Sequence, residues 1–124
     1  MKGGKMSIQK TFALVLGLVL LLVGVLGFIN NSLVGNEGYF GTNVYQDVLH
    51  LIAGAFGVYV GTKGEGRGYN LSLGWIGILL GVLGFIPGID EMLSSWLNIN
   101  THITVLHLVL GVLFLIVAYG TSRD

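Results

Sequence analysis

The chain has 124 residues, of which 53% are hydrophobic and only 10% are charged, and its formal net charge at pH 7 is zero. Soluble domains carry roughly 25% charged residues, so this composition excludes an ordinary water-soluble domain. The single Pro speaks against a disordered chain, and the lack of Cys excludes disulfides, thiolate metal sites and cysteine nucleophiles.

Four apolar segments follow one another along the chain, at about residues 11–29, 44–62, 71–87 and 103–120. Each spans roughly 26–29 Å as a helix, which matches the hydrocarbon core of a bilayer, roughly 30 Å thick. Because lipid offers no partner to a free backbone amide, each segment should be helical. The sequence therefore predicts an all-α polytopic membrane protein with four transmembrane helices, in which residues 1–124 form a single integral membrane domain.

The first segment resembles a signal peptide because Lys2, Lys5 and Lys10 precede it. Its apolar run is longer than the roughly 7–15 residues of a signal peptide, and residues 27–31 make a poor cleavage site. We expect it to be retained as a membrane-spanning helix.

The basic residues indicate the orientation in the membrane. They precede the first segment, lie between the second and third, or follow the fourth: Lys2, Lys5, Lys10, Lys63, Arg67 and Arg123. Four spans would place all of them on one side, which the positive-inside rule identifies as cytoplasmic. The sequence predicts a multi-pass protein of the cell membrane with both termini in the cytoplasm.

The chain matches itself when it is shifted by 57 residues. Residues 24–29 then fall on residues 81–86, and the VLHL of residues 48–51 falls on the VLHL of residues 105–108. One constant offset aligns both halves without a gap, which indicates a duplicated two-helix unit with copies at about residues 11–62 and 68–119. An even number of spans gives both copies the same direction, so we expect parallel-repeat hairpins related by an axis along the membrane normal.

Each copy carries one His in its VLHL and an Asn seven residues earlier, about two helical turns away and therefore on the same face. The copies differ between these positions, because an Asp in the first is matched by a Thr in the second. The residues of this candidate polar cluster or ligand site are Asn43, Asp47 and His50 in the first copy and Asn100, Thr104 and His107 in the second. We expect the two histidines at the same depth, on opposite sides of a pseudo-twofold axis near the outer ends of the second and fourth helices.

These motifs resemble a family of small prokaryotic membrane proteins with four spans that is classed as a domain of unknown function. The likeness rests on the Gly-Phe-Ile at residues 27–29 and 84–86, the Asn-to-His spacing, and the LHLxxG pattern that ends at Gly54 and Gly111. It covers nearly the whole chain, and the first copy departs from it with Asn30 where the second has Pro87. The resemblance implies a four-helix membrane fold and supplies no activity.

Two interpretations of the histidines stay open. In the first, each imidazole forms a hydrogen bond with a backbone carbonyl or with a polar neighbour. Asp47 is such a neighbour for His50. In the second, His50 and His107 are symmetric ligands of a haem or a metal ion. One His per copy and the lack of Cys favour the first, so we expect no cofactor and no metal.

The remaining features concern packing and the connections between segments. The glycines of the third segment recur every three or four residues, which indicates packing within the monomer in preference to a homo-oligomer seam. Residues 89–97 have the apolar spacing of a short amphipathic helix, and the matching residues 32–38 should be a loop. We expect His102 to be solvated in a loop, and Tyr69 and Tyr119 to belong to an aromatic belt.

No Ser-His-Asp set or metal motif can be assembled at one depth, and the first and third segments contain no ionisable residue that would mark a transport pathway. We therefore expect no catalysis and no nucleic-acid partner. The sequence predicts a structural or interaction subunit of the lipid bilayer, as a homo-oligomer or with another membrane protein. The alternative is a haem- or metal-binding membrane subunit that uses His50 and His107.

Overall fold

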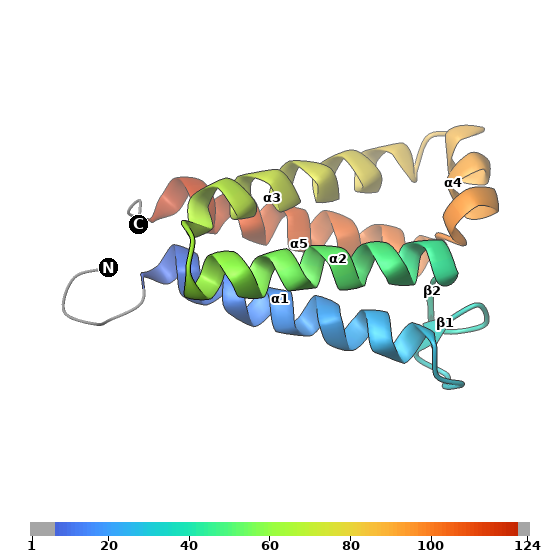
Figure 1. Ribbon diagram of the computed structural model, residues 1–124. Helices are drawn as coiled ribbons and strands as arrows, with labels where there is room; N and C mark the ends of the chain where they lie inside the picture. The colour runs from blue at the N-terminus through green and yellow to red at the C-terminus, as the bar shows by residue number, and fades with distance from the viewer. Residues whose placement is uncertain (1–6, 122–124) are drawn as a thin grey trace.

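The computed structural model describes residues 7–121, which form five helices and one short pair of strands. The elements in chain order are α1 (Ile8–Gly27), β1 (Val34–Gly35), β2 (Phe40–Gly41), α2 (Val44–Thr62), α3 (Gly66–Leu83), α4 (Ile89–Leu97) and α5 (Thr101–Gly120). The four long helices run alongside one another, and α4 crosses one end of them (Figure 1). The predicted all-α class is confirmed for these residues. Lys2, Lys5 and Arg123 lie outside the described part of the chain.

Each predicted apolar segment corresponds to one long helix, and the second matches α2 at both ends. The first helix begins three residues before its predicted start, because the Ser7 hydroxyl caps it by accepting a hydrogen bond from Lys10 N (3.1 Å). The third begins at Gly66 and includes the polar residues that hydropathy assigns to the flank. Hydropathy therefore located the four long helices and missed the polar first turns of α1, α3 and α5.

The two longer connections are built differently. The amphipathic helix predicted over residues 89–97 is confirmed as α4, which ends at Asn98 in a left-handed conformation (φ 55°). The loop predicted over residues 32–38 contains β1, which pairs in parallel with β2. Asn31 sets the turn before β1, because its Oδ1 accepts hydrogen bonds from Leu33 N (2.9 Å) and Val34 N (2.8 Å).

Glycines allow the helices to pack closely within two hairpins, α1 with α2 and α3 with α5. A Cβ added to Gly54 of α2 would lie 2.7 Å from the carbonyl oxygen of Gly17 in α1. A Cβ added to Gly111 of α5 would lie 2.8 Å from the carbonyl oxygen of Gly74 in α3. These glycines therefore pack helices within the chain, which is the role that their spacing favoured over a homo-oligomer seam.

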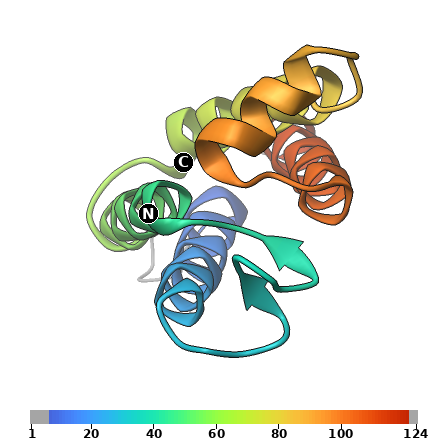
Figure 2. The ribbon, with the colours of Figure 1, turned by 90° about the vertical axis from the view of Figure 1, so that its right-hand side faces the viewer.

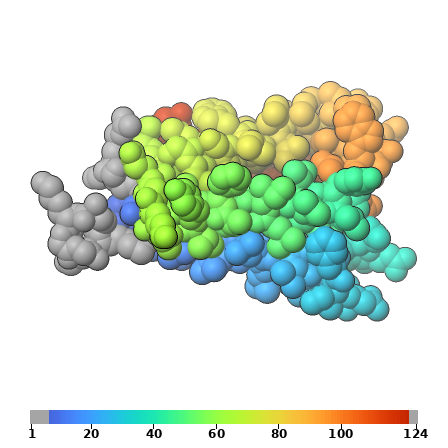
Figure 3. All heavy atoms as spheres, in the orientation of Figure 1, coloured from blue at the N-terminus to red at the C-terminus, as the bar shows by residue number. Residues whose placement is uncertain are grey.

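The two hairpins lie against each other as separate pairs, with α4 laid across the end of the bundle (Figure 2). A small buried cluster joins them through Ala13 of α1, Tyr69 of α3 and Phe114 of α5. A second cluster, Leu93, Ile99 and Ile103, lies between α4 and the start of α5. The resulting body is elongated along the long helices (Figure 3).

The distribution of side chains is opposite to that of a water-soluble bundle. Each long helix exposes large apolar side chains, among them Leu22 (58% exposed), Phe56 (60%), Leu79 (57%) and Ile116 (60%). The buried side chains include a set of polar ones: Gln9, Thr42, Gln46, Asp47, Asn70 and Thr104. In water this arrangement would be unfavourable, because large exposed apolar patches are rare on soluble monomers.

Within residues 7–121, two helices are long and apolar enough to cross a membrane. They are α1, with a mean hydropathy of 2.3 over its most apolar stretch, and α5, with 2.4. Both have 20 residues, or about 30 Å of helix, which is the thickness of a hydrocarbon core. Two of the four predicted segments thus have the length and composition of a membrane span by themselves.

Candidate functional site

A cavity of about 570 Å³ lies between the two hairpins and is lined mainly by α2, α3 and α5. Its walls are mostly apolar, and its size is that of a small-molecule site. Phe56 of α2 and Ile76 of α3 line it and are also more than half exposed, so the cavity opens to the surface between these two helices. It contains both of the candidate histidines.

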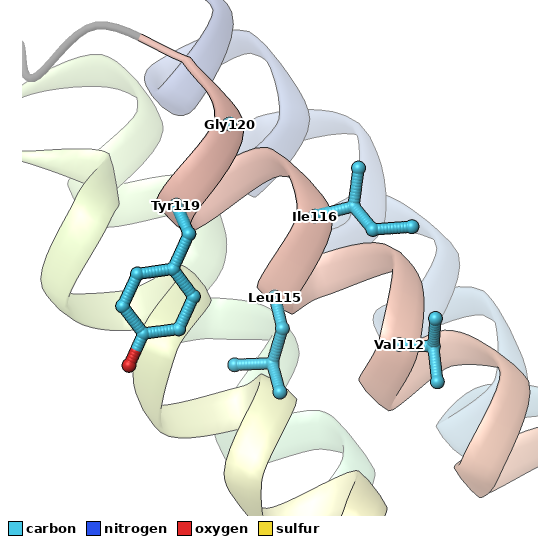
Figure 4. A pocket seen from close by; sticks show the side chains of 5 residues that line it. All are labelled: Val112, Leu115, Ile116, Tyr119 and Gly120. Carbon is cyan, nitrogen blue, oxygen red and sulfur yellow. The ribbon is translucent and has the colours of Figure 1, made fainter.

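A second, shallow hollow lies on the outward face of α5 alone. The side chains of Val112, Leu115, Ile116 and Tyr119 spread from the helix to both sides (Figure 4), and Gly120 completes the lining. Because no second element contributes a wall, this hollow is part of the outward apolar surface.

The structure brings His50 of α2 and His107 of α5 together at the boundary between the hairpins. Their ring centroids are 6.1 Å apart and the ring planes are inclined by 56°. The Nδ1 atom of each ring is enclosed by protein and has no hydrogen-bond partner among the described residues. Since both rings line the cavity and Nδ1 is enclosed, Nε2 is the nitrogen available to a bound molecule.

Asp47 and Thr104 do not join the histidine pair. The Asp47 carboxylate occupies the space beside Gly27 of α1 where a Cβ would lie, and Thr104 occupies the corresponding space beside Gly84 of α3. The Thr104 hydroxyl donates to the carbonyl oxygen of Asn100 (2.8 Å). The expected hydrogen bond between Asp47 and His50 is absent from the described residues, because the carboxylate packs on the neighbouring helix of its own hairpin.

Asn43 and Asn100 tie each hairpin to the other. The Asn43 Oδ1 caps α2, and its Nδ2 donates to the carbonyl oxygen of Trp96 at 2.9 Å. The Asn100 Oδ1 caps α5, and its Nδ2 donates to the carbonyl oxygen of Tyr39 at 3.0 Å. The two acceptors are separated by 57 residues, as are the two donors. Each Asn therefore caps its own helix and forms a brace, that is, a hydrogen bond from its Nδ2 to a carbonyl of the other hairpin. The same pair of contacts occurs at the start of α2 and at the start of α5.

Gln46 is a residue of the site that the sequence analysis missed. It is 3% exposed, and its Nε2 donates to the carbonyl oxygens of Gly41 (3.0 Å) and Leu97 (2.8 Å). It lines the cavity four residues before His50, on the same face of α2. A polar residue one helical turn before a motif histidine is the signal that would have pointed to it.

Tyr69 was expected in an aromatic belt, and that expectation is wrong. Its side chain is 8% exposed, and its hydroxyl donates to the carbonyl oxygen of Ala53 in α2 (2.7 Å). Gly57 leaves the space for it, since a Cβ there would lie 2.7 Å from the hydroxyl. Tyr119, at 61% exposure, remains on the outward surface.

His102 is exposed, as expected, but it lies in a helix and not in the expected loop. It belongs to the first turn of α5, and its ring stacks on Tyr39 with centroids 3.9 Å apart and planes inclined by 11°. Its Nδ1 lies 3.0 Å from the Tyr39 carbonyl oxygen. His102 is exposed and is not part of the cavity.

At the opposite end of the bundle, Gln9 and Asn70 form a second buried polar group that sequence analysis missed. The Gln9 Nε2 donates to the carbonyl oxygens of Val117 (3.0 Å) and Ala118 (3.1 Å), which lie in the last turn of α5. The Asn70 Nδ2 donates to the Gln9 Oε1 at 2.9 Å. Gln9 therefore satisfies carbonyls that the end of a helix leaves without an internal partner.

The histidine pair fits a metal ion only in part. No group of three or more His, Cys, Asp or Glu within residues 7–121 is arranged to hold a metal. With a metal–nitrogen bond of about 2.0 Å, the observed centroid separation requires a nearly linear arrangement, as two axial haem ligands have. A ligating imidazole normally donates its other N–H to an acceptor, and neither Nδ1 has one among the described residues.

A family model described as a domain of unknown function (DUF4383) matches residues 10–120. No curated protein and no solved structure matches the chain.

Proposed function

From the premise that the chain belongs to the family of the domain of unknown function DUF4383, we propose that it is an integral membrane protein with four spans. The observation that carries the proposal is the inverted distribution of side chains, with apolar groups outward on all four long helices and polar groups inside. A bilayer favours this arrangement, because apolar side chains meet lipid and polar ones find partners within the protein.

The two middle helices are proposed to cross the bilayer together with α1 and α5. The helices α2 and α3 have 19 and 18 residues, close to the 20 residues of α1 and of α5. Their most polar residues lie near their first turns, at Asp47 in α2 and at Arg67 and Asn70 in α3. These positions are at the ends of the spans, where the cost of a polar side chain is smallest.

The two hairpins are proposed to be tandem copies that face the same way. Two kinds of matching contact support this: the Gly54 and Gly111 crossings, and the Asn43 and Asn100 braces, each related by the 57-residue shift. A duplicated unit with an even number of spans keeps its direction in the membrane.

Both termini are proposed to be cytoplasmic. The described basic residues Lys10, Lys63 and Arg67 lie at the start of α1 and at the connection of α2 to α3. That is the end of the bundle opposite α4 (Figure 1). Basic residues mark the cytoplasmic side.

We assign the protein a structural or interaction role in the membrane, without catalysis. Asn43, Asn100 and Gln46 bond backbone groups of the bundle itself. Its partners would be the lipid bilayer and a further membrane protein, either another chain or a second copy. The alternative of a haem- or metal-binding subunit is favoured by the 6.1 Å approach of His50 and His107, and weakened by the lack of an acceptor for either Nδ1.

Single-cysteine labelling in intact cells tests the proposed topology, because the native chain has no Cys. An impermeant maleimide should label Asn36→Cys and Ser95→Cys from outside, and Glu65→Cys only after permeabilisation. All three positions are exposed. Labelling of position 65 from outside, or release of the protein by alkaline carbonate, would overturn the proposal.

A further inference from the structure

We propose that the cavity between the hairpins binds a neutral, membrane-soluble molecule whose carbonyl oxygen accepts hydrogen bonds from both His50 and His107. The inference rests on the proposed membrane location, because the cavity opens sideways between α2 and α3, where lipid would surround it. A bound molecule could place its oxygen at the histidines and extend its apolar part through this opening.

The hydrogen-bonding character of the pair follows from the enclosed Nδ1 atoms. A neutral imidazole carries one N–H, on either nitrogen. A buried N–H without an acceptor is rarer in proteins than a buried acceptor without a donor. Since neither Nδ1 has a partner among the described residues, the proton is better placed on Nε2 in both rings. The pair then presents two N–H donors to the cavity and needs an acceptor there.

The separation of the rings fits one oxygen atom between them. If a ring nitrogen lies about 1.1 Å from its centroid and an N–H···O bond spans about 2.9 Å, each centroid lies about 4 Å from the shared oxygen. The observed 6.1 Å between centroids then corresponds to an angle of about 100° at that oxygen. This angle suits the two lone pairs of a carbonyl oxygen.

The charge of the lining indicates that the ligand is neutral. The described lining residues include His, Gln, Ser and Tyr but no Lys, Arg, Asp or Glu. A carboxylate or phosphate would therefore enter without a basic partner, and a metal cation without an acidic one. A ketone or a quinone has no such requirement, and either satisfies the two donors.

Binding can be tested with matched probes on the full chain in phosphatidylcholine nanodiscs. The probes are 2-dodecanone, dodecane, which lacks the oxygen, and dodecanoate, which carries a charge. Decylubiquinone forms a fourth arm, and comparison with 2-dodecanone distinguishes a quinone from a simple ketone. We expect one or both carbonyl probes to bind more tightly than dodecane and dodecanoate.

His50→Phe and His107→Phe keep an aromatic ring in place and remove the donor. Each should weaken binding of the carbonyl probe by about tenfold, as expected for one lost hydrogen bond to a buried acceptor. The matched control is His102→Phe, which lies outside the cavity and should bind as the unaltered chain does. Unchanged affinity in both cavity variants would overturn the proposal.

A spectroscopic measurement on the unaltered chain does not depend on how the variants fold. With ¹⁵N-labelled histidine, 2-dodecanone or decylubiquinone should shift the Nε2 resonances of His50 and His107 and leave those of His102 unchanged. Protons found on Nδ1, or stoichiometric haem or metal lost in either Phe variant, would overturn it in favour of a metal site. Cysteine labelling reports the topology separately, so a failure of the membrane proposal is distinguishable from a failure of binding.

Discussion

The hydroxyl of Tyr69 in α3 lies 2.7 Å from the carbonyl oxygen of Ala53 in α2 and donates a hydrogen bond to it. This bond joins α3 of one hairpin to α2 of the other, and both of its residues line the cavity. Because both groups are partly buried, the bond holds the inner wall of the cavity in position.

Tyr69→Phe should destabilise the protein by about 0.5–1.5 kcal/mol, the usual net value of one hydrogen bond. Reversible unfolding in mixed detergent and SDS micelles measures this free energy. Tyr59→Phe is the matched control, since Tyr59 is 59% exposed and should change stability little. Equal effects of the two substitutions would show that the Ala53 bond does not hold the hairpins together.

Gly54→Ala and Gly111→Ala should each destabilise the fold by about 1–3 kcal/mol through overpacking. The new methyl groups would lie 2.7–2.8 Å from backbone atoms of the neighbouring helix, which cannot yield as a flexible side chain can. If the hairpins are copies, the two losses should be similar. Gly68→Ala is the control, because a Cβ at Gly68 meets nothing within 4 Å, and alanine is the better helix former.

The approach of His50 to His107 illustrates how far the sequence can be read. The 57-residue shift predicted that they are one position in two copies, and the apolar segments predicted the helices that carry them. Their 6.1 Å contact could not be predicted, because it depends on how closely the two hairpins pack, and no local pattern encodes that distance. The orientation of Asp47 towards Gly27 was likewise set by a neighbouring helix.

Gln9 and Asn70 were missed for a related reason. They are 61 residues apart and lie outside both copies of the VLHL motif. Gln9 is next to Lys10, and Asn70 follows Arg67 by three residues at the edge of an apolar segment, so hydropathy treats both as part of a polar flank. Their burial results from α1, α3 and α5 meeting at one end of the bundle, which is a tertiary effect.

Gln9→Leu should cost about 0.5–1.5 kcal/mol, because it removes the side-chain hydrogen bonds to the Val117 and Ala118 carbonyl oxygens and from the Asn70 amide. The three groups keep other partners, which are Thr121 Oγ1, Arg67 Nε and the backbone oxygen of residue 9, respectively. Hydrogen exchange should also show faster opening of the last turn of α5, which Gln9 caps. Ser72→Ala serves as the control, since Ser72 is exposed and its hydroxyl bonds only a carbonyl of its own helix. Unchanged exchange at the end of α5 would contradict the capping role.

Asn43→Ala and Asn100→Ala should each destabilise the protein by about 1–2 kcal/mol, because each removes a helix cap and a hydrogen bond to the opposite hairpin. Asp at the same positions retains the capping oxygen but has no amide to donate. The stability lost in Asn→Asp therefore measures the hydrogen bond between the hairpins alone. Asn36→Ala, at an exposed position, provides the baseline in the same unfolding experiment. If the two braces are equivalent, the Ala-minus-Asp difference should be the same at both positions. If the Asn→Asp variants are as stable as the unaltered protein, the cap accounts for the whole loss of stability in the Ala variants. That result would show that the bonds to the Trp96 and Tyr39 carbonyls do not hold the hairpins together.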